Sequence, residues 1–138
     1  LQTVLLRTDI LLINETEAQS LAGVNNLAEA ALILMEMGPD IVVIKQGSAG
    51  ASLFQGDKRI DIGVFPIDSV VDPTGAGDTF GGGFMASLAG SNDLTEALVN
   101  GSALASFCVE GFGVEKLISF ESQELTRRRD YLRSTVKS

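Results

Sequence analysis

The sequence contains no histidine and only one cysteine, Cys108. A single cysteine cannot form an internal disulfide, and without histidine the chain cannot build a Cys/His zinc site. No apolar run approaches the ~20 residues that a helix needs to cross a bilayer. The N-terminus also lacks the basic, apolar and small-residue regions of a signal peptide. These absences predict a cytoplasmic protein.

Basic residues are too few to balance the acidic ones. The 138 residues include 10 Lys and Arg against 18 Asp and Glu, which gives a formal charge of −8 and a pI of about 4.4. Nucleic acids and anionic membranes normally require a basic surface, so neither is expected as a partner. An anionic ligand would have to be held by local backbone amides and a metal ion. The 45% hydrophobic content is sufficient for the core of one compact domain.

Short apolar runs alternate with helical patterns along the chain. Continuous apolar runs at 10–13 and 41–44 are typical of strands buried on both faces of a parallel sheet. A further strand is predicted at 67–71, and the segments 51–54 and 59–62 flank a tight glycine loop that predicts a hairpin at a sheet edge.

Helices are predicted between the strands, and their ends are marked by glycines and by capping residues. Gly23 and Gly90 are the expected C-caps of two helices, and Asp93 with Glu96 predicts a capping box at the start of another. The predicted helices span residues 15–22, 27–37, 75–89, 94–109 and 121–132.

The alternation of strands and helices predicts an α/β fold, in which ligands bind beyond the carboxyl ends of the strands. Asn14, Gly47 and Asp72 each follow a predicted strand. We therefore expect these polar and glycine positions to meet at one rim of the sheet.

The segment Asp72-Pro73-Thr74-Gly75-Ala76-Gly77-Asp78 joins a glycine turn, a helix start and a carboxylate. Amides at such a turn can hold the oxygens of a phosphoryl group, and a carboxylate beside them can accept a proton from an attacking hydroxyl. The alternative is a turn whose glycines only provide positive φ. Against this alternative stand Gly81, Gly82 and Gly83, because each glycine within a helix costs about 1 kcal/mol relative to alanine. Something is expected to approach that helix closely.

Residues 72–84 resemble the C-terminal signature of the ribokinase-like (PfkB) family of carbohydrate kinases. Asn14-Glu15-Thr16-Glu17 is similar to the family's N-x-x-E motif, and Lys45 to Gly50 resemble its G-x-x-G nucleotide loop. The resemblance implies a three-layer α/β sandwich with a mostly parallel sheet. It also implies that residues 1–138 form the nucleotide-binding and catalytic half of a kinase domain, without the N-terminal half and lid.

The resemblance further implies the roles of individual residues. Asp78 would be the catalytic base, and the amides of Gly75, Ala76 and Gly77 would form the anion hole. ATP would be bound by residues of the other two motifs and of the 94–109 helix: Asn14, Lys45, Gly47, Gly50, Asn100 and Ala103. Two alternatives stay open: Gly47 and Gly50 could simply form a turn, and tight helix packing explains the small residues after Asn100 equally well.

Two cation sites are implied in the same way. Glu17 would organise Mg²⁺ through water and phosphate, as suits a hard cation. The alternative for Asn14 and Glu17 is a helix cap followed by a first-turn acid. A monovalent cation, K⁺ in particular, would be bound by Asp72 and Thr74 with backbone oxygens near three further residues: Ser106, Val109 and Gly111.

The predicted function is ATP-dependent phosphoryl transfer to a primary hydroxyl of a sugar or a nucleoside, with a homodimer formed through the lid. The segment alone is expected to be inactive, and a non-catalytic nucleotide-binding module is the alternative. A Rossmann-type dinucleotide-binding domain is disfavoured because Asp78 would repel a pyrophosphate, and a P-loop NTPase because the chain has no Gly-Lys-Ser/Thr triplet. Cys108 is predicted to be a small core residue, and residues 127–129 a solvated arginine run near a helix C-terminus.

Overall fold

The computed structural model describes residues 9–67, 75–110 and 122–138. They form two compact units: the chain up to Asp61 together with Lys137–Ser138, and residues Ile62–Val136. None of the helices in these ranges is both long enough and apolar enough to pass through a lipid bilayer. The strand predicted at 67–71 lies almost entirely outside the described residues.

The first unit is built on a four-stranded sheet with the order β1-β2-β3-β4. Strand β1 (Ile10–Asn14) pairs in parallel with β2 (Ile41–Lys45), and β2 pairs antiparallel with β3 (Ala51–Gln55). Strand β4 (Lys58–Ile62) completes the predicted hairpin with β3. The sheet of the described residues is therefore mixed, whereas the sequence predicted a mostly parallel one.

The two parallel strands differ in burial. Residues Ile41–Ile44 of β2 are buried, as predicted, whereas the apolar residues of β1 are only half-buried. The prediction of burial on both faces is wrong for β1, because this strand stands at the end of the sheet order and has one neighbouring strand among the described residues.

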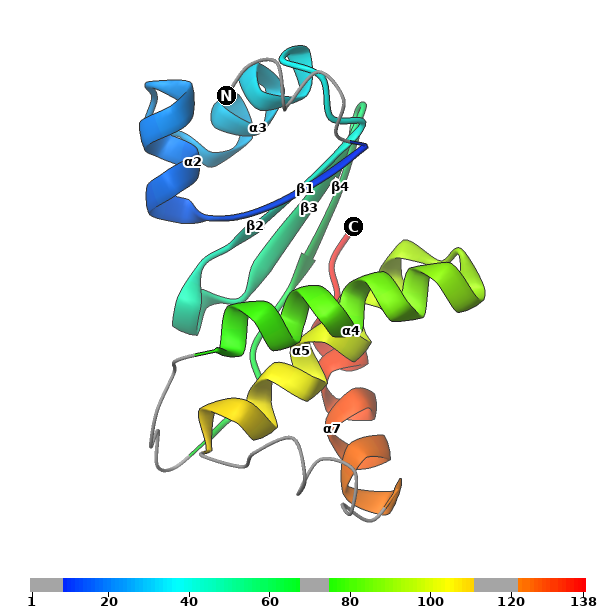
Figure 1. Cartoon of the computed structure of the whole chain (residues 1–138). Coiled ribbons are helices and arrows are strands. Elements are labelled where there is room, and N and C mark those ends of the chain that lie inside the picture. The colour runs from blue at the N-terminus through cyan, green and yellow to red at the C-terminus, as the bar shows by residue number, and fades with distance from the viewer. Residues whose placement is uncertain (1–8, 68–74, 111–121) are drawn as a thin grey trace. The chain divides into compact units, whose positions relative to one another are not determined.

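Helices α2 (Glu15–Ala22) and α3 (Leu27–Glu36) lie side by side next to β1 and β2 (Figure 1). Their ends follow the predicted signals: Gly23 has φ 76° at the C-cap of α2, and Asn26 caps α3 by accepting from the Glu29 amide. Small, branched and aromatic side chains fill the space between helices and sheet. This core consists of Ala18, Ala31, Leu34, Val42, Ile44 and Phe54.

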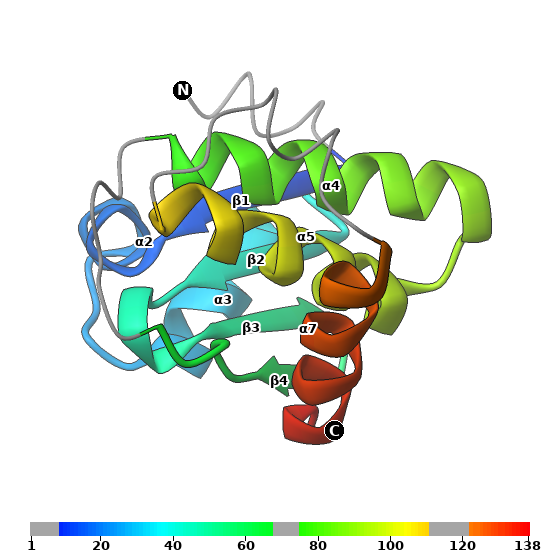
Figure 2. The ribbon, with the colours of Figure 1, turned by 90° about the horizontal axis from the view of Figure 1, so that it is seen from below.

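The second unit consists of α4 (Ala76–Ser91), α5 (Leu94–Val109) and α7 (Ser122–Thr135), with α5 in contact with both other helices (Figure 2). Glycines allow α4 and α5 to approach closely. A Cβ on Gly83 would lie 2.8 Å from Leu104 Cδ1, and one on Gly101 would lie 2.8 Å from the Phe80 carbonyl oxygen. The close neighbour predicted for the glycine run is therefore α5, at least at Gly83.

Helix α4 ends later than predicted. Gly90 lies within the helix, and Asn92, with φ 56°, is the C-cap. Asparagine tolerates the left-handed conformation better than most residues, which is why it can replace glycine here.

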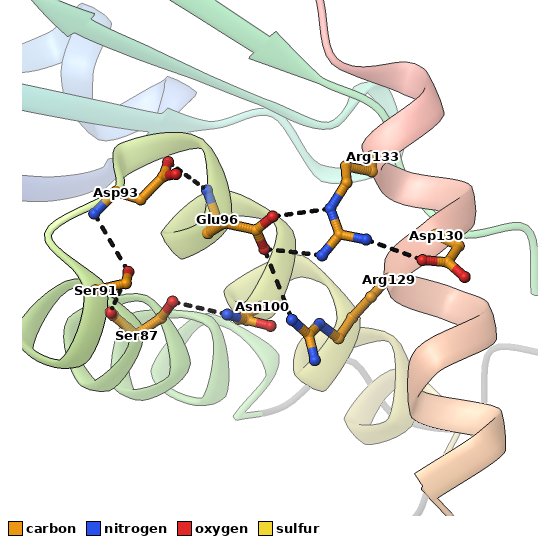
Figure 3. A network of polar contacts seen from close by, with 8 residues as sticks. All are labelled: Ser87, Ser91, Asp93, Glu96, Asn100, Arg129, Asp130 and Arg133. Atoms are coloured by element: carbon orange, nitrogen blue, oxygen red, sulfur yellow. Dashed lines mark hydrogen bonds and ion pairs between the residues drawn. The ribbon is translucent and has the colours of Figure 1, made fainter.

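The start of α5 is half of the expected capping box. Asp93 Oδ1 accepts from the Glu96 amide at 3.1 Å, but the Glu96 carboxylate faces α7 (Figure 3). There it accepts two hydrogen bonds of 2.9 Å from Arg133. These bonds lower the pKa of Glu96 and raise that of Arg133. Glu96 thus joins α5 to α7 instead of closing its own cap.

The prediction that residues 127–129 are a solvated run near a helix end is wrong in its position and for Arg128, whereas the Arg127 side chain is 63% exposed, as predicted. The three residues lie in the middle of α7, and Arg128 is only 4% exposed. Its guanidinium contacts two carboxylates and the ring of Phe107, which is 3.9 Å from the Arg128 Cζ atom. A buried guanidinium requires such partners. Glu124 is four residues away on α7, whereas Glu110 and Phe107 lie far away in the sequence.

Candidate functional site

Two of the predicted nucleotide-binding residues lie side by side at the carboxyl ends of parallel strands. Asn14 ends β1 and Lys45 ends β2, and the register pairs them directly. Gly47 follows Lys45 closely, so the first unit brings Asn14 and Gly47 to one edge of its sheet, as expected, together with Lys45. Asp72, the other residue predicted there, lies outside the described residues.

Asn14 and Glu17 form a complete capping box. The Glu17 amide donates to Asn14 Oδ1 at 2.7 Å, and the Asn14 amide donates to Glu17 Oε1 at 3.4 Å. The alternative interpretation of Asn14 and Glu17, a helix cap followed by a first-turn acid, is therefore present in the structure. The box uses one oxygen of each side chain. The side-chain NH₂ group of Asn14 and the second carboxylate oxygen of Glu17 are left for a ligand, and both side chains are exposed.

The loop after β2 depends on its glycines. Gly47 has φ 57° and Gly50 has φ 101°, and a short 3-10 turn, η1 (Gly47–Ala49), lies between them. The loop is closed by a bond of 2.8 Å from the Gln46 amide to the Gly50 carbonyl. This geometry presents an exposed backbone at Gly47, while Gly50 is buried.

A polar chain that sequence reasoning missed supports this loop. Gln46 Nε2 donates to Ser52 Oγ at 2.8 Å, and Ser52 Oγ donates to Asp61 Oδ1 at 2.5 Å. Ser52 is 1% exposed although it is polar. The alternation of β3 gave no signal for this role, because Ser52 looks like any small strand residue until its partner on β4 is known.

The second group of predicted residues forms the start of α4. Gly75 is the N-cap with φ 85°, and no side chain of the residues that the structure describes caps the helix. Its carbonyl accepts the first helical bond, from the Thr79 amide at 2.9 Å. The amides of the first turn therefore have no intrahelical acceptor. Asp78 lies in this turn with an exposed side chain.

The last turn of α5 lies against this helix start. A Cβ on Gly75 would lie 3.8 Å from the sulfur of Cys108, so α5 faces the turn that contains the predicted anion hole. Cys108 is half-buried, which agrees only in part with the predicted core position. The structure thus brings Gly75, Ala76, Gly77 and Asp78 together beside the C-terminal end of α5.

The α5 residues predicted to face a nucleotide are mostly occupied by packing. Ala103 is fully buried, and Gly101 is packed against α4. At Ala103 the structure therefore shows the alternative interpretation, close packing, because the side chain is covered in the described residues. Asn100 is half-buried and donates to Ser87 Oγ at 2.7 Å, as Figure 3 shows.

The residues predicted to bind a monovalent cation are described only in part. Ser106 is buried, and its Oγ donates to the Ala103 carbonyl at 2.6 Å. Val109 ends α5 and is half-buried. Asp72, Thr74 and Gly111 lie outside the described residues.

Arg128 is the functional candidate for which the sequence offered no signal. Its Nη1 donates to Ser106 Oγ at 3.0 Å, and its guanidinium forms ion pairs with Glu110 and Glu124. Arg127 donates to Glu124 as well, and these hydrogen bonds hold the pKa of Glu124 down to about 2, with Arg127 as the larger cause. An arginine within a run of arginines cannot be distinguished by its local sequence.

The donor set suits magnesium bound mainly through water and phosphate. No three Asp, Glu, Cys or His residues cluster as a metal site in residues 9–67, 75–110 and 122–138. Magnesium often uses only one or two carboxylates of the protein and keeps several waters. The exposed carboxylate of Glu17 fits that pattern.

Comparison with known proteins decides the family. The family model for pfkB family carbohydrate kinases matches residues 1–119. The chain belongs to this family. The α/β fold class and the kinase resemblance are thereby confirmed.

The relatives of this pfkB family member are sugar and nucleoside kinases. A ribokinase of Arabidopsis thaliana is 38% identical over 108 residues, covering 74% of this chain and 28% of that protein. A cytidine kinase of Thermococcus kodakarensis is 36% identical over 100 residues, covering 71% of this chain and 36% of that protein.

Solved structures agree with this assignment. Arabidopsis thaliana ribokinase complexed with ribose and ATP matches with a TM-score of 0.78 and 31% identity, over 94% of this chain and 43% of that chain. A putative ribokinase II from E. coli in complex with ATP and Mg²⁺ matches with a TM-score of 0.80 and 28% identity, over 94% and 42%. The chain thus spans less than half the length of the relatives that it matches.

Proposed function

We propose that the full-length protein transfers the γ-phosphoryl group of ATP to a primary hydroxyl of a sugar or nucleoside. Residues 1–138 would supply the nucleotide-binding and catalytic half of that enzyme. The membership of the pfkB family supports the reaction class, and the names of the relatives, ribokinase and cytidine kinase, support the two acceptor classes.

The observation that carries the proposal is the start of α4. An uncapped glycine turn leaves first-turn amides available for anionic oxygens, and an exposed carboxylate, Asp78, belongs to the same turn. The positive end of the helix dipole adds to the attraction for phosphate. A proton acceptor beside amides that can hold phosphoryl oxygens is the combination that phosphoryl transfer to a hydroxyl uses.

In the proposed reaction Asp78 accepts the proton of the acceptor hydroxyl through a carboxylate oxygen as that hydroxyl attacks the γ-phosphorus. The bond between the γ-phosphorus and the β,γ-bridging oxygen breaks, and ADP leaves with that oxygen. The amides of Gly75, Ala76 and Gly77 donate to the phosphoryl oxygens, whose charge they offset. Catalysis by these residues is then positioning together with electrostatic stabilisation. General base catalysis of this kind typically contributes about 10²–10⁴ in rate.

The first unit would bind the nucleotide. Lys45 and the exposed backbone at Gly47 would bind the phosphates. Asn14 would donate from its side-chain NH₂ group, which its capping box does not use. Glu17 would hold Mg²⁺ through water. When bound, Mg²⁺ supplies neutralisation of phosphate charge.

Further parts of the proposal rest on the family resemblance. They are a K⁺ site at Asp72 and Thr74 with the end of α5, a homodimer formed through the lid, and a cytoplasmic location. Potassium dependence of the purified enzyme tests the first of these, and sedimentation of the full-length protein tests the second.

The experiment that tests the function uses the full-length protein with ATP, Mg²⁺ and a panel of sugars and nucleosides. We expect ADP release that depends on one acceptor class, with a new phosphomonoester in the ³¹P NMR spectrum. A folded protein that binds ATP but transfers phosphate to no acceptor on the panel would instead support the non-catalytic nucleotide-binding module.

A further inference from the structure

Arg128 is a buried cation that the proposed reaction does not use. Its side chain is 5% exposed, and it projects from the middle of α7, a helix whose other two consecutive arginines are more exposed. A guanidinium is rarely withdrawn from water to this extent unless several partners hold it. Those partners show which parts of the chain it joins.

The partners of Arg128 come from three segments of the second unit. From α5 and its C-cap come Ser106, with its Oγ 3.0 Å from Arg128 Nη1, and the carboxylate of Glu110. From α7 itself comes Glu124, whose Oε1 lies 3.0 Å from Arg128 Nε. The ring centroids of Phe107 and Phe65 lie 3.9 and 4.7 Å from the Arg128 Cζ atom.

These contacts concentrate on the last turn of α5. Ser106, Phe107 and Glu110 all belong to that turn or cap it, so Arg128 fixes the turn from the side, through charge, hydrogen bond and ring contact together. Cys108 belongs to the same turn and lies next to Gly75, at 3.8 Å from the place of a Cβ on that residue. One turn of α5 therefore connects Arg128 with the glycine turn that precedes Asp78.

The other end of α5 offers a comparison. Glu96, in its first turn, is bound by Arg133 through two hydrogen bonds of 2.9 Å, so a second arginine of α7 also ties the two helices together (Figure 3). Glu96 lies at the opposite end of α5 from Cys108. Arg129 also pairs with Glu96, at 3.7 Å. Among the arginines of α7 that the structure describes in contact with α5, Arg128 is thus the one that reaches the turn beside Gly75.

We propose that Arg128 is a positioning residue of the phosphoryl-transfer site, which holds the last turn of α5 against the Gly75 turn and so sets the geometry of the anion hole and Asp78. This inference rests on the proposed function. Its physical basis is that a displacement of about 1 Å at a reacting group can cost about 10² in rate. Arg128 does not contact the reacting atoms and acts only through α5.

The test compares Arg128→Met with Arg133→Met in the full-length protein, each assayed well below its own melting temperature. Both variants remove one α7 guanidinium that binds a carboxylate of the α5 region. At saturating ATP and acceptor, we expect kcat to fall at least tenfold in Arg128→Met and to stay within twofold of the wild type in Arg133→Met. We expect the KM of the acceptor to change less than threefold in both, because neither residue is proposed to bind it.

The outcomes separate the inference from the function. If the wild type phosphorylates an acceptor and folded Arg128→Met keeps kcat within twofold, the inference is wrong while the function stands. An equal loss of kcat in both variants would also overturn it, because the effect would then be general to the helix pair. A wild type without transfer overturns the function itself.

A conservative variant covers the case in which Arg128→Met does not fold. Arg128→Lys retains the charge but loses the planar fork that reaches Ser106 and both carboxylates. We expect a folded protein with kcat between that of the wild type and one tenth of it, and with an unchanged KM for the acceptor. Wild-type kcat in folded Arg128→Lys would contradict the inference, and so would failure of both Arg128 variants to fold, since the role would then be structural.

Discussion

Replacing Gly101 by alanine tests the close contact between α4 and α5, on which the position of the α4 start depends. A Cβ at this position would lie 2.8 Å from the carbonyl oxygen of Phe80 and 3.4 Å from Phe80 Cδ2 and Phe84 Cβ. The nearest neighbour is backbone within a helix, so it cannot rotate away as a side chain would. The two helices must move apart until that contact reaches an ordinary distance.

The magnitude follows from two opposing terms. Alanine in place of a helical glycine stabilises the helix by up to about 1 kcal/mol. Forcing an extra methyl group into a packed interface costs about 1–3 kcal/mol. We therefore expect Gly101→Ala to lower the free energy of unfolding by up to about 2 kcal/mol.

Gly90→Ala is the matched control for this prediction. Gly90 lies in α4, and an added Cβ would meet no atom within 4 Å. The gain in helix propensity then acts alone, so this variant should be as stable as the wild type or more stable by up to about 1 kcal/mol. Urea denaturation of the full-length protein measures both variants. Equal stabilities of the two variants would refute the reasoning, because the close contact would then carry no cost.

Three further predictions concern other parts of the site. Gly75→Ala places a Cβ at φ 85° and should cost about 1–2 kcal/mol of stability and lower kcat, as measured by urea denaturation and steady-state kinetics. Asn14→Ala removes the α2 cap and should cost about 1 kcal/mol, whereas Asn14→Asp should keep most of it. The pKa of Glu124 is depressed from 4.5 to about 2, so its ion pairs stabilise the fold above the ordinary pKa and are lost as pH falls towards about 2. Glu124→Gln should flatten this part of the stability profile, and an unchanged profile would contradict the assignment.

Local signals in the sequence predicted the elements well where caps decide them. Helix α2 begins and ends as predicted because Asn14 and Gly23 act on their immediate neighbours. The same rule placed the end of α4 at Gly90, and this was wrong because Asn92, not Gly90, adopts the left-handed conformation. Gly90 and Asn92 can each end a helix, and a rule that considers only neighbouring residues cannot decide between them.

Burial was harder to predict because it depends on distant partners. The apolar run of β1 resembles that of β2, yet β1 is only half-buried because it stands at the end of the sheet order. The residues of a strand do not show which place the strand takes in that order. Arg128 is the larger failure. Its charge predicted exposure, and only the folded arrangement brings Ser106 and Glu110 to it.

The site itself was predicted in its parts. The glycine turn and Asp78 occur at a helix start as the sequence indicated, and Asn14 lies beside Lys45 as the parallel strands require. The burial of Ala103 on α5 could not be predicted from the sequence, because small residues serve close packing and ligand contact equally well. Which of the two applies depends on the neighbouring helix.

The most direct test of the account measures kcat and ATP affinity in Asp78→Asn, with Glu29→Gln as the control. Glu29 is likewise an exposed first-turn acid, at the start of α3, so its loss has a similar effect on a helix dipole. We expect Asp78→Asn to lower kcat by about 10²–10⁴ and to leave the Kd for ATP within a few-fold, whereas Glu29→Gln changes neither. Turnover of folded Asp78→Asn at the rate of the wild type would contradict the claim that this carboxylate is the base.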